Sequence, residues 1–147
     1  MNEVKNLEEH FFGATKKLTV FAAQIQSQKV FYEFHIAQNS IIFMSFLNRL
    51  FEHLDKNKKY VFILDNAGWH KTQLVNNYFE KEKSWIKVEF IPPYSPELNP
   101  IETNWKITRN RVTKSNYFKT IDDLQIALET FWDEHIFTQK FIRYLCR

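Results

Sequence analysis

Two acidic residues, Asp65 and Glu102, stand where a divalent-metal site for phosphate chemistry could be built. Asp65 directly follows the apolar run 60–64, which is typical of a buried strand. Glu102 lies in the first turn of a helix that the sequence predicts from Asn99 or Pro100 onward. Because the ends of neighbouring parallel strands open on one side of a sheet, we expect the two carboxylates to face a common site.

Basic residues follow Glu102 along the same predicted helix. Lys106 and Arg109 share a helix face with Glu102, and Arg111 and Lys114 come after them. This pattern would place a carboxylate for a metal ion beside cations for DNA phosphates. We therefore expect these four cations to bind DNA without sequence preference and with an affinity that falls as salt rises. An ordinary solvated helix face explains the same spacing equally well.

Both carboxylates also have a simpler structural use. Asp65 can cap the turn 66–68, since Asp side chains bond backbone amides two residues on. With Asn99 as N-cap, Glu102 falls at the capping-box position, and it can also pair with Lys106 one helical turn away. On the local sequence alone, the turn role of Asp65 is favoured over a metal site.

The rest of the sequence predicts the elements that must hold this pair. Their order is β-β-α-β-α-β-α-α-α, an antiparallel hairpin followed by βαβ units. Helical spacing also predicts the buried faces of three helices. The predicted elements are strands 18–25 and 30–36 around a turn at 26–28, a helix 39–54, a strand 60–64 covered on both faces, a helix 72–83, a strand 86–91, helices from 99 and from 120, and an amphipathic segment 137–145. The predicted buried side chains are Leu74, Val75, Tyr78 and Phe79, then Ile101, Trp105 and Val112, then Leu124, Ala127, Leu128 and Phe131.

Composition limits the class of protein. A chain of 147 residues with 44% hydrophobic and 17% aromatic residues has the length and apolar content of one folded domain. The net charge of +3 says little about a nucleic-acid partner. The single cysteine, Cys146, excludes an intrachain disulfide and a cysteine-based zinc site. No apolar run reaches transmembrane length, so we expect no membrane partner and a cytoplasmic protein, bound to the nucleoid when it holds DNA.

Two stretches of this sequence together resemble a known family. They are residues 63–67 (ILDNA) with His70, and residues 92–102 (PPYSPELNPIE) followed by Trp105. The long second stretch is a specific signature. On these residues the chain resembles the catalytic domain of the DDE transposases of the IS630/Tc1/mariner superfamily, from about residue 18 to residue 135.

The resemblance implies an α/β fold of the RNase H-like type, a mixed sheet flanked by helices. It implies that Asp65 and Glu102 are the second and third catalytic acids and that they bind Mg²⁺ or Mn²⁺. Asn66, His70 and Asn99 match the same motifs and are expected to support the site. Members of the family cut DNA at transposon ends and join the freed 3′ hydroxyl to target DNA.

The sequence departs from the family pattern at its beginning. The first catalytic aspartate of the family lies on a strand before the hairpin, but residues 1–17 contain no aspartate, and the first one is Asp55. We expect an irregular segment 1–17 and an N-terminally truncated domain 18–147. The chain would then be a decayed copy, or the product of a second reading frame joined to an upstream one. With two of three acidic ligands, little or no activity is expected of the chain alone.

Other interpretations stay open on the sequence. A non-catalytic remnant could bind DNA or self-associate. An RNase H-like nuclease could take its third carboxylate from Glu33 or Glu97. The absence of a central strand would leave unpaired strand edges, so we expect the hairpin to pair directly with strand 60–64 or the chain to form a homodimer.

Overall fold

The computed structural model describes residues 18–25, 30–114 and 116–137. Over these residues the helices and strands follow one another in the predicted order. The predicted turn 26–28, the segment 1–17 and all but the first residue of the segment 137–145 lie outside the described residues. The elements are β1 Thr19–Gln24, β2 Val30–His35, α1 Ser40–Glu52, β3 Tyr60–Leu64, α2 Gln73–Lys81, β4 Ile86–Phe90, α3 Pro100–Thr108 and α4 Ile121–Glu134.

The strands pair in two groups. β1 and β2 are antiparallel, with Thr19 opposite His35, and β3 and β4 are parallel, with Leu64 opposite Phe90. Within the described ranges these are two separate two-stranded sheets. The expected direct pairing of the hairpin with β3 is therefore wrong.

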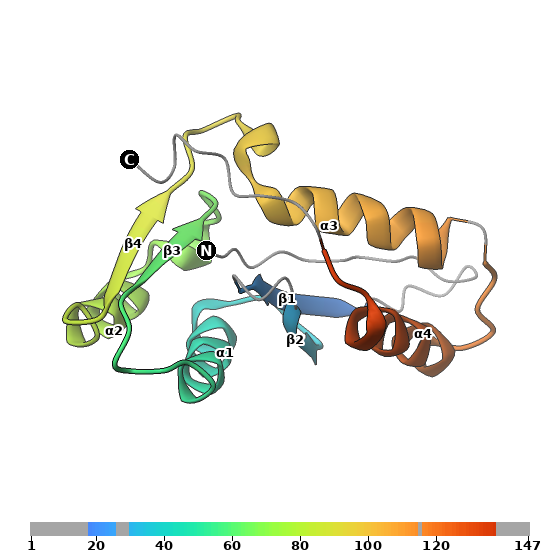
Figure 1. The fold of residues 1–147 in the computed structure, drawn as a ribbon, viewed down its shortest axis with the longest axis horizontal. Coiled ribbons are helices and arrows are strands. Elements are labelled where there is room, and N and C mark those ends of the chain that lie inside the picture. The colour runs from blue at the N-terminus through green and yellow to red at the C-terminus, as the bar shows by residue number, and fades with distance from the viewer. Residues whose placement is uncertain (1–17, 26–29, 115, 138–147) are drawn as a thin grey trace.

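The burial of β1 explains why the hairpin does not shift toward β3. All six residues of β1 are buried, so both of its faces are covered. Phe21 and Ala23 belong to one hydrophobic cluster with α1, α2 and β3, whereas Val20 and Ala22 belong to a second cluster with α3 and α4. Figure 1 shows the hairpin between these two halves of the molecule. A shift of β1 would empty both clusters at once.

Each predicted helix start is confirmed by a side-chain cap. Asn39, Thr72 and Asn99 accept hydrogen bonds from the first turns of α1, α2 and α3. Thr120 and Asp123 form a reciprocal capping box at the start of α4. None of the helices in the described ranges has the length and apolar character needed to cross a membrane.

Some predicted faces are corrected by the structure. Leu74 was predicted to be buried but is 44% exposed. The buried face of α2 is formed by Val75 and Phe79, and Leu74 lies at the edge of that face. β3 is not covered on both faces along its length, since Val61 is 38% exposed. In α4 the buried line continues to Trp132, which the sequence did not predict.

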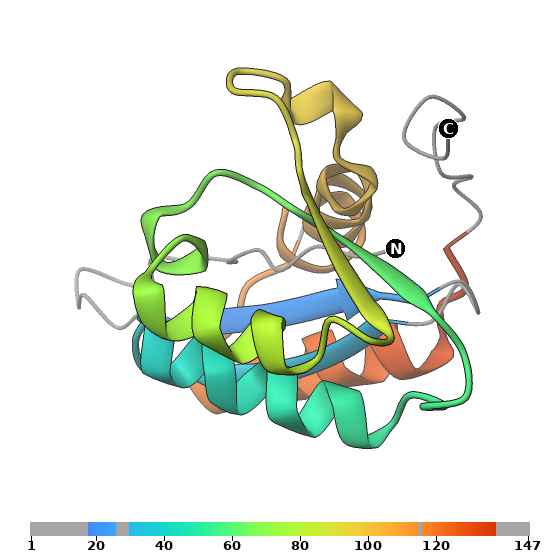
Figure 2. The ribbon, with the colours of Figure 1, turned by 90° about the vertical axis from the view of Figure 1, so that its left-hand side faces the viewer.

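The loop after β4 leads the chain from the sheet to α3. Its first residue donates its backbone N–H to the carbonyl of Leu64 over 2.8 Å, which extends the β3–β4 pairing by one residue to Ile91. Figure 2 shows the loop projecting beyond the ends of β3 and β4 before the chain turns back into α3. The ends of both strands and the start of α3 are thus gathered at one side of the molecule.

Candidate active site

Asp65 is the first residue after β3, and the turn that follows fixes its carboxylate. Its Oδ1 accepts a hydrogen bond from the amide of Ala67 at 2.9 Å. The side chain is 24% exposed, so one part of the carboxylate reaches the surface. The predicted capping of the turn is therefore confirmed.

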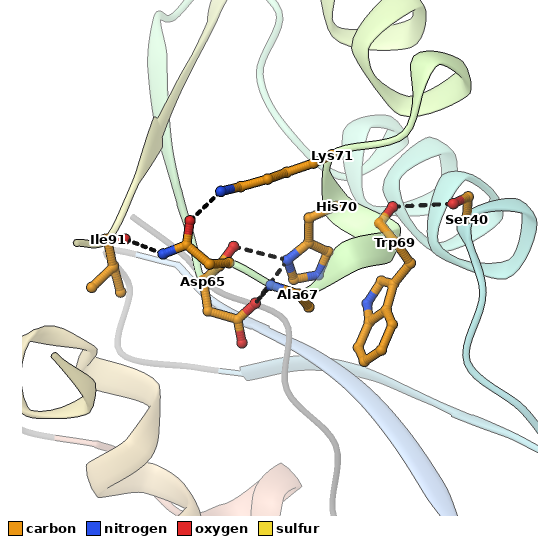
Figure 3. Close-up of polar contacts among 8 residues, drawn as sticks. Ser40, Asp65, Ala67, Trp69, His70, Lys71 and Ile91 are labelled. Carbon is orange, nitrogen blue, oxygen red and sulfur yellow. Dashed lines mark hydrogen bonds and ion pairs between the residues drawn. The ribbon is translucent and has the colours of Figure 1, made fainter. Parts of the chain in front are cut away.

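His70 holds the same oxygen from the interior. Its Nδ1 lies 2.9 Å from Oδ1 of Asp65 and 3.3 Å from the carbonyl oxygen of Asp65, while the ring is fully buried (Figure 3). Its Nε2 is buried without a hydrogen bond to the described part of the chain, and the ring packs 4.5 Å from that of Phe43. Both contacts of Nδ1 are with acceptors, so the geometry favours the tautomer in which Nδ1 carries the proton and donates it.

Asn66 ties the ends of the two parallel strands together. Its Nδ2 donates to the carbonyl of Ile91, and its Oδ1 accepts from Nζ of Lys71 (Figure 3). The Lys71 ammonium also lies 4.9 Å from the ring centroid of Phe90. Lys71 thus brings a positive charge to Asn66, one of the residues that line the site, and the sequence did not predict this contact. Its position directly after the LDNA-x-x-H motif was the available signal.

A cavity of about 360 Å³ opens beside these residues. It joins the end of β3, the end of β4, the proline-rich loop and the residue that caps α3. The lining residues are Asp65, Asn66, Ile91, Pro92, Pro93, Tyr94, Ser95 and Asn99. Two of the predicted supporting residues, Asn66 and Asn99, thus share one cavity with Asp65.

Glu102 occupies the first turn of α3, as predicted. Its amide donates to the carbonyl of Asn99 over 3.1 Å. The side chain of Asn99 accepts from the amide of Ile101 at 3.2 Å. Ile101 lies one residue before Glu102, so Asn99 caps the helix at a different amide from the one that the predicted capping box requires. The Glu102 side chain is half-buried, and its Oε1 is shielded from solvent.

A buried chain of polar contacts fixes α3 against its neighbours. Nδ2 of Asn104 donates to Oε1 of Gln24 at 2.7 Å, which joins α3 to β1. Nε1 of Trp132 donates to the hydroxyl of Thr108 at 2.9 Å, which joins α4 to α3. The predicted inward residues Ile101, Trp105 and Val112 are also buried. These contacts set the rotation of α3 and hence the direction in which Glu102 points.

The predicted DNA-binding cations lie on and after α3. Lys106, Arg109, Arg111 and Lys114 are all exposed. The helix continues as a wide turn, Arg109–Thr113, in which the amide of Lys114 donates to the carbonyl of Arg109 at 2.8 Å. Their exposure fits phosphate contacts, whereas their binding to DNA stays a prediction.

A family model described as DDE superfamily endonuclease matches residues 12–125. This match spans well over half of the chain. The chain belongs to the DDE superfamily endonucleases. The motifs that carry the resemblance, around Asp65 and Glu102, lie within the matched residues.

Two curated relatives align with part of this DDE superfamily chain. Protein y4pE/y4sA of Sinorhizobium fredii is 36% identical over 81 residues, which are 55% of this chain and 56% of the relative. A 39 kDa protein of insertion element IS630 from Shigella sonnei is 29% identical over 80 residues, 54% of this chain and 23% of the relative. The chain thus spans about half of the first relative and about a quarter of the second.

Solved structures show the same fold. The catalytic domain of Mos1 mariner transposase has a TM-score of 0.76 at 18% identity, with 91% of this chain and 70% of that domain covered. The Mos1 catalytic domain has also been solved with raltegravir and Mn, and Mos1 as a strand transfer complex. Retroviral integrase catalytic cores match as well, so the fold is the RNase H-like fold of transposases and integrases.

Two other acids of this DDE superfamily chain, Glu33 and Glu97, were alternative sources of a third carboxylate. Glu33 forms an ion pair with Arg49 of α1. Glu97 is exposed in the short turn Pro96–Leu98. Among the residues that the structure describes, no group of three or more His, Cys, Asp and Glu side chains could hold a metal ion. That Asp65 and Glu102 are the catalytic acids stays a prediction from the resemblance.

Proposed function

We propose that this chain forms part of the catalytic domain of a DNA transposase, in which Asp65 and Glu102 hold Mg²⁺ or Mn²⁺. One observation carries the proposal. Asp65 at the end of β3 shares a cavity with Asn99, which caps the helix that bears Glu102 in its first turn. Family membership supports the same assignment of the two acids.

The chemistry of these residues fits the proposed ions. Mg²⁺ and Mn²⁺ prefer oxygen ligands, above all carboxylates. His70 and the amide of Ala67 both hold Oδ1 of Asp65, which fixes the orientation of the carboxylate before any ligand arrives. Bound ions would activate the attacking hydroxyl and stabilise the leaving oxygen of a phosphodiester. The Mos1 catalytic domain solved with Mn supports this choice of metal.

The proposed substrates are transposon ends and target DNA. The exposed cations Lys106, Arg109, Arg111 and Lys114 would hold phosphates beside the acids, while Lys71 adds a charge at Asn66. The strand transfer complex of Mos1 supports a DNA substrate. A DNA substrate and the lone cysteine support the cytoplasm, at the nucleoid, as the compartment.

We infer that the third acid is supplied by the product of an upstream transposase reading frame. Among the described strands, β1 and β3 are each paired along one edge, and an added strand could pair between them. Such a strand would end near Asp65 if it ran parallel to β3. The chain is also proposed to form a homodimer, which light scattering at several concentrations would detect as a doubling of mass.

A cleavage assay tests the proposed function. The chain is assayed alone and together with the upstream reading-frame product, using labelled transposon-end DNA and Mn²⁺. We expect background cleavage from the chain alone and nicking plus strand transfer from the pair, with both lost in Asp65→Asn and Glu102→Gln. Cleavage that survives either substitution, or no cleavage by the pair, would contradict the proposal.

A further inference from the structure

We propose that Tyr94 is a stacking platform for an unpaired DNA base next to the phosphate that is handled at Asp65. The inference deepens the proposed function and rests on it. It names the form in which DNA enters the site: a nucleotide whose base has left the duplex stack. The observations that carry it are the backbone of Tyr94, the exposure of its ring and its place in the cavity.

Tyr94 has a backbone conformation that its side chain does not favour. Its φ is 58°, and it is the one non-glycine residue with a positive φ in the described ranges. In this left-handed region the Cβ atom crowds the backbone, so glycine and asparagine are the usual occupants. A bulky residue held there needs a reason, and such residues gather at functional sites.

Packing within the chain does not supply that reason. Tyr94 is 101% exposed, so within the described part of the chain its ring finds no packing that would offset the strained backbone. A large aromatic ring that stands fully in water also forgoes its hydrophobic stabilisation. Both costs fall on one residue, and a flat apolar partner that covered the ring would restore the hydrophobic stabilisation and offset the backbone strain.

The loop places Tyr94 in the lining of the site's cavity. Tyr94 lines the same cavity as Asp65 and Asn99. It follows two prolines, which restrict the backbone on its N-terminal side. On its C-terminal side the hydroxyl of Ser95 donates to the carbonyl of Pro93 at 3.4 Å, and the carbonyl of Ser95 accepts from the amide of Leu98 at 3.1 Å. The ring is thus presented from a braced loop.

The cavity matches the two parts of a nucleotide. The exposed residues Pro92, Pro93 and Tyr94 line its apolar part, where a base could lie, whereas Asp65, Asn66 and Asn99 offer polar groups. Nζ of Lys71, bound to Asn66, places a cation for the phosphate beside that polar side. A base inside a duplex has both faces covered by its neighbours, so a base on Tyr94 must be at a frayed end, at a nick or flipped out. Every base has a flat π-face, so the contact would carry little sequence preference.

The test measures base stacking and DNA binding separately. An oligonucleotide with 2-aminopurine in an unpaired overhang is titrated with the full chain in the presence of Mn²⁺, and anisotropy reports binding while 2-aminopurine fluorescence reports stacking. We expect quenching with the parent chain and with Tyr94→Phe. Tyr94→Gly and Tyr94→Ala should lose the quenching and bind about tenfold more weakly.

Tyr94→Gly is the decisive variant, because glycine adopts the left-handed backbone without strain and the fold should be kept. A melting temperature equal to or above that of the parent chain confirms this. Quenching and affinity that are equal in parent and Tyr94→Gly would overturn the stacking inference alone, since DNA binding itself would persist. No binding by the parent chain would instead overturn the proposed function, and the inference with it.

Discussion

Nδ1 of the buried His70 lies 2.9 Å from Oδ1 of Asp65, so an interior ring fixes one oxygen of a carboxylate that reaches the surface. The amide of Ala67 donates to the same oxygen. The loop after β3 therefore sets the direction of Asp65 from two sides. A carboxylate oriented in this way needs less rearrangement when a metal ion arrives, as the role proposed for Asp65 requires.

Removal of the ring should weaken metal binding more than it weakens the fold. In His70→Leu the donor to Asp65 is lost, and the Mn²⁺ affinity should fall about 10-fold or more. His70→Asn is the matched control, because its amide nitrogen can replace Nδ1 and should keep most of the affinity. Electron paramagnetic resonance of free Mn²⁺ measures both. Equal affinities of the parent chain and His70→Leu would show that the ring is only a packing residue.

Charge reversal on α3 should weaken DNA binding through phosphate contacts. The double variant Lys106→Glu/Arg109→Glu should bind a duplex more weakly, and the slope of log affinity against log salt should fall by about one per lost contact. Lys58→Glu is the control, since this exposed lysine lies in the connection between α1 and β3. Anisotropy titrations between low and moderate salt give both quantities. A slope that does not change would remove these cations from the DNA interface.

The strained backbone of Tyr94 predicts that replacing this residue by glycine does not destabilise the fold. Tyr94→Gly relieves the left-handed strain and should leave the free energy of unfolding equal or raise it by up to about 1 kcal/mol. Tyr94→Ala removes the same ring but keeps the Cβ atom, so it should not share the gain. Urea denaturation of the two variants separates strain from the exposed ring. A destabilised Tyr94→Gly would show that the ring contributes to folding after all.

The buried contact between Asn104 and Gln24 should matter to the fold, because it joins α3 to β1. Asn104→Ala leaves the Gln24 amide buried without its donor and should lower the free energy of unfolding by about 1–3 kcal/mol. The double variant Asn104→Leu/Gln24→Met replaces both polar groups by apolar ones and should recover much of this loss. Urea denaturation of Asn104→Leu, Gln24→Met and the double variant forms the cycle. Strict additivity would mean that the two amides do not interact.

The elements that carry the acids could be predicted because their signals are local. An apolar run that ends in Asp65 indicates a strand end, and Asn99 before a proline indicates a helix start; the structure has both. Helical spacing likewise located Ile101 and Trp105 in the interior. In each case the side chains that decide the structure lie within a few residues of one another.

Other features depend on contacts between distant segments. The separation of the hairpin from β3 follows from the burial of β1 between two hydrophobic clusters, and no local pattern shows it. Lys71 reaches Asn66 and the ring of Phe90 only after β3 and β4 have paired. The positive φ of Tyr94 runs against the preference of its own side chain, so its residue type indicates the opposite conformation.

The most direct test of the central claim is Mn²⁺ binding by the parent chain, Asp65→Asn and Glu102→Gln, with Glu97→Gln as control. If Asp65 and Glu102 hold the ion together, each of their substitutions should lower the affinity about tenfold or more, while the exposed Glu97 should contribute nothing. Melting temperatures close to that of the parent would confirm that the folds are kept. The account would be contradicted if Glu102→Gln bound Mn²⁺ as tightly as the parent chain, because the two acids would then not share a site.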